Sequence, residues 1–203
     1  QGLLGWYMVK SGLVDKPHVS HFRLAAHLLT ALSVMVYILW VIMDIVYPSR
    51  ESVHVKGLKK GVWALLILIV LQITYGAFVA GLKAGFMYNT FPKMGSNWLA
   101  PEVGEGGFAS LFSHGATVQF IHRTLGVILM ILAPLFWVWA RRQNVVGRQN
   151  RGLVFLNVSV GIQVLLGILA LLYIVPVSLG VIHQAGAAVV LCAVVYLLHQ
   201  TKE

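Results

Sequence analysis

Five long apolar runs constrain this chain more than any other feature of its sequence. The longest, from Gly152 to His183, contains no Asp, Glu, Lys or Arg and exceeds what one crossing of a bilayer needs. A helix crosses the hydrocarbon core with about 20 apolar residues, and only helices and closed barrels satisfy their own backbone polar groups in lipid. The runs show no period-two alternation, which excludes a barrel. The sequence therefore predicts an all-α fold, a polytopic bundle of transmembrane helices.

Pro176 divides the longest run, because proline interrupts a continuing helix. Residues 2–9 have the composition of the tail of a further apolar helix. The sequence thus predicts that tail followed by five spans, over about 22–47, 58–82, 116–140, 152–174 and 177–199.

Charge sets the expected orientation of these spans. Hydrophobic residues make up 59% of the chain and charged residues only 10%, yet the net charge is +9. Basic residues beside spans mark the cytoplasmic or matrix side of a membrane rather than nucleic-acid binding. They gather in two connections that the span count places on one face: Arg50, Lys56, Lys59 and Lys60, then Arg141, Arg142, Arg148 and Arg151. We expect that face to be the inner one, and the connection over 83–116 to lie on the outer face.

Three of the eight histidines stand inside predicted spans, close to their outer ends. These are His27, His122 and His183. Ionisable residues within a span are costly, usually face the bundle interior and mark function. Two neutral imidazoles from opposed helices can coordinate one iron axially, with a porphyrin held between the helices. We expect the other five to be solvated or at helix edges: His18, His21, His54, His114 and His199.

Small residues follow each intramembrane histidine on its own helical face, three or four positions on. They are Ala31, Gly126, Gly186 and Ala187, and they predict room for a flat macrocycle. Arg123 adds a permanent cation suited to a propionate carboxylate. One alternative is a seam of small residues with hydrogen-bonded histidines, and another is a copper or zinc site. The single cysteine, Cys192, excludes a disulfide framework and is expected to pack as a small apolar residue.

Two parts of the chain resemble each other. Leu3-Leu4-Gly5 followed by His27 can be laid over Leu165-Leu166-Gly167 followed by His183. Both copies run in the same direction, which predicts a parallel repeat about an axis along the membrane normal. With a four-helix unit, residues 58–203 form one complete half and residues 1–57 the end of another.

Several strings resemble the haem A synthase family, in its mitochondrial and proteobacterial branch, and the resemblance covers nearly the whole chain in one order. They are GWYMVKSGL at 5–13, RLAAH at 23–27, AGLKAG at 80–85, YNTFPKM at 88–94, QFIHR at 119–123 and His183-Gln184. The string at 88–94 is the most specific.

The resemblance implies an eight-helix enzyme of two similar four-helix halves that oxidises a ring methyl of haem O to a formyl group, for cytochrome oxidase assembly. It implies that His122 and His183 bind a haem b cofactor, that Arg123 contacts it, and that His27 is the catalytic, iron-binding histidine of the substrate half. Lys83 and Lys93 would be further propionate contacts. The chain departs from the family in lacking a counterpart of about the first three helices, including the second-helix histidine and its accompanying acidic residue.

The resemblance also implies where the protein works and with what. We expect an integral protein of a bacterial or mitochondrial inner membrane. Its expected partners are lipid, haem O, haem O synthase and an electron donor or acceptor, with no nucleic acid, and homo-oligomerisation stays open. Two rival functions remain: a bis-His cytochrome b type electron carrier, and a parallel-repeat transporter.

Overall fold

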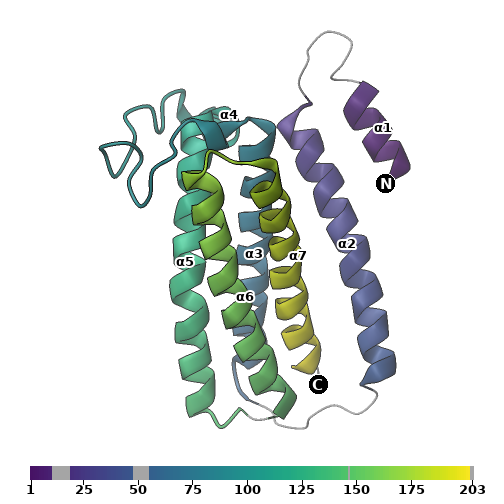
Figure 1. The fold of residues 1–203 in the computed structure, drawn as a ribbon. Coiled ribbons are helices and arrows are strands. Elements are labelled where there is room, and N and C mark those ends of the chain that lie inside the picture. The colour runs from purple at the N-terminus through teal and green to yellow at the C-terminus, as the bar shows by residue number, and fades with distance from the viewer. Residues whose placement is uncertain (11–18, 48–54, 146, 202–203) are drawn as a thin grey trace.

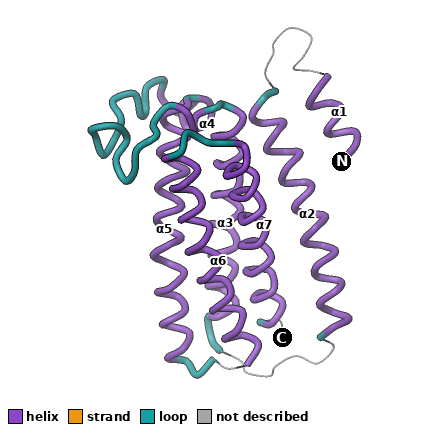
Figure 2. Tube along the Cα trace, viewed as in Figure 1, coloured by secondary structure: helices purple, strands orange, loops and turns teal. Residues whose placement is uncertain are grey.

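The computed structural model describes residues 1–10, 19–47, 55–145 and 147–201. These parts of the chain are helical with no strand, which confirms the predicted all-α class (Figures 1 and 2). The order is α1 (Gly2–Lys10), α2 (His21–Val46), α3 (Leu58–Gly81), the short helices η1 (Ala84–Phe86), η2 (Gly107–Ala109) and α4 (Ser110–Ser113), then α5 (Gly115–Arg142), α6 (Gly147–Leu172) and α7 (Val177–Gln200).

Five of these helices are long and apolar enough to cross a membrane: α2, α3, α5, α6 and α7. Large apolar side chains cover their outward faces, among them Val34, Ile67, Leu135, Val158 and Val181. In water such a surface would be strongly unfavourable, whereas lipid solvates it. The protein is therefore an integral membrane protein.

The helix boundaries agree with the predicted spans, with one informative difference. The α6 helix begins at Gly147 rather than near Gly152, because the polar segment from Arg148 to Arg151 continues the helix beyond the apolar run. Pro176 separates α6 from α7 as predicted, and it stands at the N-cap of α7. The preceding Ile174 and Val175 have positive φ values of 59° and 50°, so the chain turns sharply there.

Long helices that follow each other along the chain run antiparallel, whereas α2 and α7, which are also in contact, run in the same direction. The α6 helix packs along α7 and α3 along α5, while α2 contacts both α3 and α7, and α1 lies beside α2 (Figure 1). Glycines allow the close contacts: a Cβ on Gly81 would lie 2.6 Å from the Cα of His21, and one on Gly152 would lie 3.2 Å from Leu197. Small residues therefore allow the backbones to approach closely at the α2–α3 and α6–α7 contacts.

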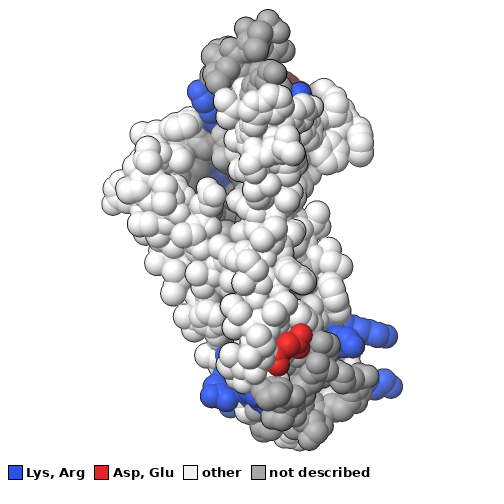
Figure 3. All heavy atoms as spheres, turned by 90° about the vertical axis from the view of Figure 1, so that its right-hand side faces the viewer, with Lys and Arg blue, Asp and Glu red and all other residues white. Residues whose placement is uncertain are grey.

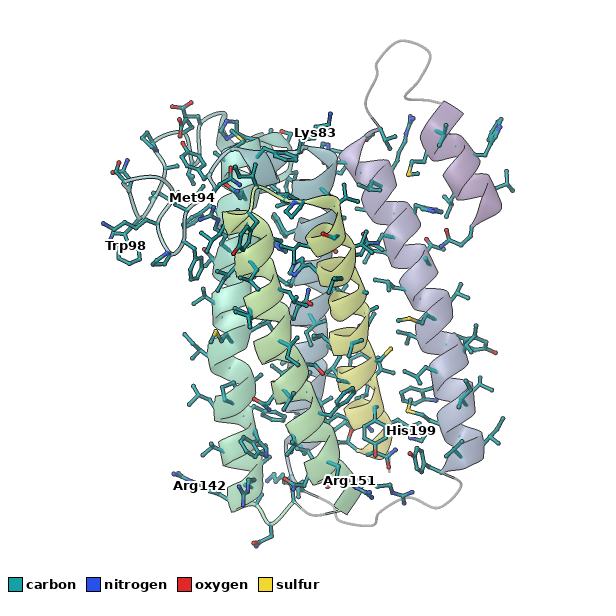
Figure 4. All side chains as sticks on the ribbon, in the orientation of Figure 1. Lys83, Met94, Trp98, Arg142, Arg151 and His199 are labelled. Carbon is teal, nitrogen blue, oxygen red and sulfur yellow. The ribbon has the colours of Figure 1, made fainter. Side chains whose placement is uncertain are left out.

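On the face shown in Figure 3, charged residues gather toward the two ends of the bundle and the middle carries none. We call the end that carries residues 82–114 the loop end, where Lys83, Met94 and Trp98 lie (Figure 4). We call the other the basic end, where Arg142, Arg151 and His199 lie (Figure 4). Among the residues that the sequence assigned to loops, His18, Arg50 and His54 lie outside the described part of the chain.

The prediction that His199 is solvated is wrong. His199 is 1% exposed, and its Nε2 lies 3.0 Å from Asp44 Oδ1 of α2. Its Nδ1 lies 3.0 Å from Gln200 Nε2, and its ring meets Trp40 edge-on at 5.1 Å between centroids. Tertiary packing of α2 against α7 buries a residue that hydropathy alone places at a wet helix end. His21 is also partly buried, with its ring 5.4 Å from that of Phe78.

Candidate functional site

The three intramembrane histidines lie at one depth. His27 is the seventh residue of α2, His122 the eighth of α5 and His183 the seventh of α7, so each stands about two turns from the loop end. Helices α2, α5 and α7 all run from the loop end toward the basic end. The predicted matching of depth is therefore confirmed.

Each of these imidazoles packs against a glycine of the preceding long helix. A Cβ on Gly5 of α1 would lie 3.4 Å from Cε1 of His27, and one on Gly76 of α3 would lie 3.1 Å from Cε1 of His122. A Cβ on Gly167 of α6 would lie 2.9 Å from Cε1 of His183. The two parts of the predicted repeat therefore make the same contact, between Gly5 and His27 in one and between Gly167 and His183 in the other. Gly76 and His122 make this contact as well.

His122 and His183 face each other across the bundle. Their ring centroids are 6.5 Å apart and the ring planes are nearly perpendicular, at 87°. A metal ion bonded to one nitrogen of each ring at about 2.0–2.1 Å would separate the two centroids by roughly 6 Å. The pair therefore has the donor chemistry and the spacing to hold one metal ion between the two rings. His122 Nδ1 is buried with no hydrogen-bond partner in the described parts of the chain.

His27 belongs to a different place in the bundle. Its ring lies against α1, and its Nδ1 is buried without a partner among the described residues. No group of three or more His, Cys, Asp or Glu side chains that could hold a metal is found in the same described ranges. The structure therefore brings together two of the three predicted iron ligands and leaves the third apart from them.

Glutamine side chains of the neighbouring helices pack against the glycines that follow the paired histidines. Gln72 Nε2 of α3 lies 3.3 Å from where a Cβ on Gly126 would be, and a Cβ on Gly186 would collide with Gln163 of α6. Small residues at these two positions were expected to leave room for a macrocycle. In this structure they make room for amides instead.

Arg123 holds the connection at the loop end. Its guanidinium donates to the carbonyl oxygens of Thr90 at 2.8 Å, Lys93 at 3.2 Å and Tyr88. Gln119 donates to the same Tyr88 oxygen at 3.1 Å. The string from Gln119 to Arg123 therefore places its histidine in the bundle and its Gln and Arg on the backbone of residues 88–93. One donor, the buried Nε of Arg123, has no partner in the described structure.

A second contact fixes the same connection farther along. Tyr88 donates its hydroxyl to Glu102, which raises the pKa of the phenol and lowers that of the carboxyl, because the hydrogen bond favours the neutral phenol beside the carboxylate. Lys93 Nζ stands 5.6 Å from the ring centroid of Trp98, which is 69% exposed. Lys83 and Trp98 both lie at the loop end (Figure 4).

The residues that sequence reasoning missed are partners of histidines. His199 bonds Asp44, and Gln163 Nε2 lies 3.1 Å from His183 Nδ1 and donates to the His183 carbonyl oxygen at 2.8 Å. A signal for the second contact was present, because a Gln stands four residues before a Gly ahead of each intramembrane histidine in the sequence.

These features define a class: a polytopic helical membrane protein with a paired-histidine site two turns below one surface. The COX15-CtaA family model, described as cytochrome oxidase assembly protein, matches residues 1–195. The chain belongs to this family, as the resemblance of its strings predicted.

Curated relatives agree with this assignment. The chain is 39% identical over 207 residues to a Heme A synthase of Nitrosospira multiformis, with 100% of the chain and 58% of the relative covered. It is 42% identical over 204 residues to a Heme A synthase of Flavobacterium psychrophilum, with 98% and 60% covered. The chain thus spans about three fifths of the length of the curated relatives it matches.

Proposed function

We propose that this chain is part of a haem A synthase, in which His122 and His183 bind a haem b cofactor and His27 binds the substrate, haem O. The observation that carries the proposal is the His122–His183 pair, with ring centroids 6.5 Å apart on facing helices. The names of the curated relatives support the activity. The alternative of copper or zinc is less well supported, since no further His, Cys or carboxylate joins the pair within the described residues.

The protein's own groups would bind and orient the cofactor. His122 of α5 and His183 of α7 would hold it, and a bound haem would supply one-electron redox chemistry inside the membrane. The buried Nε of Arg123, which stands next to His122 at the loop end, is a free donor for a propionate. Its other donors hold residues 88–93, so the same side chain would tie the connection to the cofactor's edge.

The reaction sets requirements that these residues meet only in part. Oxidising a ring methyl to a formyl group breaks two C–H bonds. With water as the oxygen source, four electrons and four protons are released, two of the protons from the methyl group and two from the water. We propose that a membrane electron acceptor takes the electrons and that His27 holds the substrate iron. Gly5 of α1 packs against the His27 ring and keeps it in place.

Spectroscopy tests the cofactor site. The protein purified in detergent should show a low-spin, bis-imidazole haem spectrum, and His122→Ala or His183→Ala should abolish it. His114→Ala is the matched control, because His114 lies at the loop end and bonds Thr117 at 3.1 Å. A spectrum unchanged by both ligand substitutions would refute the assignment.

A product assay separates the enzyme from its rival, a bis-His electron carrier. Cells that lack haem A synthase and carry the full-length gene containing this sequence should convert haem O to haem A, measured in extracted haems by chromatography. His27→Ala should stop conversion while the haem b spectrum persists. If haem b is present and no haem A forms with the unchanged gene, the electron carrier is the correct function.

A further inference from the structure

A Gln and a Gly four residues apart precede each intramembrane histidine. Both residues lie within α3 and within α6, whereas Gln1 stands immediately before the start of α1. The three segments are Gln1 to Gly5 before His27, Gln72 to Gly76 before His122, and Gln163 to Gly167 before His183. Residues four apart lie on one helical face, one turn from each other. In every case the glycine is the residue that packs against the imidazole. The Gln of each segment therefore faces the same neighbouring helix, one turn farther from the loop end.

The contact is most complete at His183. The Gln163 amide nitrogen donates to the His183 carbonyl oxygen at 2.8 Å and lies 3.1 Å from its Nδ1. Gly186 makes this possible, because a Cβ there would collide with Gln163. In this orientation the amide donates to Nδ1, which places the proton of a neutral imidazole on Nε2. A metal on Nε2 requires that proton to be on Nδ1 instead. Rotating the amide would then present Oε1, which is buried without a partner in the described structure, as the acceptor for Nδ1–H in place of the bond to the His183 carbonyl oxygen.

The other two segments make related contacts. Gln1 Nε2 donates to the carbonyl oxygen of His27 at 3.1 Å, which repeats the backbone contact of Gln163. Gln72 lies over Gly126, one turn beyond His122, with its Oε1 buried and unpartnered within the described ranges. An amide thus reaches the backbone of the histidine or the next turn of its helix at all three sites.

Other polar residues of α6 do not contact a histidine in this way. Asn157 donates to Leu153 and Ser159 to Phe155, both within α6 itself. Gln149 also reaches α7, but at the basic end, where its amide donates to the Gln200 carbonyl oxygen at 3.1 Å. Among these four residues, only Gln163 meets an intramembrane histidine.

We propose that these Gln-x-x-x-Gly segments are positioning elements for the iron-binding imidazoles. The glycine lets the edge of the ring approach the preceding helix closely. The glutamine holds the histidine's backbone or, at His183 with the amide rotated, accepts from Nδ1–H and so leaves Nε2 for the metal. The inference rests on the proposed haem site. Partners that orient a ligating histidine set its basicity, and losing them weakens metal binding about 10–100-fold.

The test compares variants of α6 in the haem-loaded protein. Gln163→Leu and Gly167→Ala should each lower haem affinity about 10–100-fold and raise the fraction of haem that binds carbon monoxide. Gln163→Glu should keep the bis-imidazole spectrum and lower the midpoint potential, because a carboxylate is a stronger acceptor for Nδ1–H. The matched controls are Asn157→Leu and Gly161→Ala, since Asn157 bonds only within α6 and a Cβ on Gly161 meets no atom within 4 Å.

A second readout does not need haem. In the haem-free protein, the ¹⁵N shifts of the His183 ring report the hydrogen bond at Nδ1 and should change with Gln163→Leu but not with Asn157→Leu. Unchanged ¹⁵N shifts, together with wild-type affinity and potential, would overturn the inference. If the unsubstituted protein shows no bis-imidazole spectrum, the proposed haem site is refuted. The ¹⁵N shifts would still decide whether Gln163 positions the His183 ring. Gln163→Glu keeps the test valid if Gly167→Ala fails to fold.

Discussion

Arg123 offers the sharpest test of how the loop end is built. Replacing it with Met keeps the length of the aliphatic chain and removes every donor. Three hydrogen bonds are lost, to the carbonyl oxygens of Tyr88, Thr90 and Lys93. A hydrogen bond to a charged group contributes about 1.5–3 kcal/mol. Because Arg123 is only half-buried and water competes for it, we take that range for the three bonds together.

Such a loss should open residues 88–94 about 10–100-fold more often, since each 1.4 kcal/mol is a factor of ten. Trypsin reports the opening at the bond that follows Lys93. In the closed form this bond is protected, because Met94 is 2% exposed and its N–H donates to the Asn97 carbonyl at 2.8 Å. The rate of cleavage at Lys93 should therefore rise by the same factor in Arg123→Met.

The control is Arg142→Met, a substitution of the same kind at the basic end of the same helix. It should leave cleavage at Lys93 unchanged. Arg123→Lys should behave nearly as Arg123→Met, because a single ammonium cannot reach three carbonyls in a fixed fork. A cleavage rate in Arg123→Met within a factor of two of the unsubstituted protein would refute the idea that Arg123 holds the connection.

Two further predictions concern contacts at opposite ends of the bundle. A double-mutant cycle of Asp44→Ala and His199→Leu should give a coupling of about 0.6–1.7 kcal/mol in unfolding measurements in mild detergent; strict additivity would contradict the pairing of α2 with α7. The Tyr88–Glu102 bond should be intact above pH 4.5, the ordinary carboxyl value, and should weaken as the pH falls through the lower folded pKa of Glu102. Cleavage near Tyr88 by pepsin, which is active in acid, should then rise as the pH is lowered through this range, and Glu102→Gln should remove that pH dependence.

Features set by local rules were predictable from the sequence. The lengths of the apolar runs predicted the five spans, and Pro176 predicted the break between α6 and α7. Both features depend on residues that are neighbours in the sequence. The depth of the histidines followed directly from those spans. The grouping of the chain into residues 1–57 and 58–203, the orientation and the iron-binding roles stay predictions.

Contacts between distant segments were not predictable in the same way. His199 and Asp44 are 155 positions apart in the sequence, so only the packing of α7 on α2 shows that their side chains meet. Arg123 was expected at a propionate, yet most of its donors bond backbone carbonyls, which no side-chain pattern in the sequence reveals. The glutamines were visible as a spacing, but only the structure distinguishes Gln163, which crosses to α7, from Asn157, which does not.

The three glycine–histidine contacts also show which part of the fold sets the site. Helices α6 and α7 are joined by residues 173–176 alone, whereas α3 and α5 are joined by residues 82–114. Yet Gly167 meets His183, and Gly76 meets His122, through the same ring edge at nearly the same distance. The helix–helix packing therefore fixes the imidazoles, and the length of the connection does not. This leaves the long connection free to take on a separate task, and Arg123, one residue after His122, joins it to the site together with Gln119.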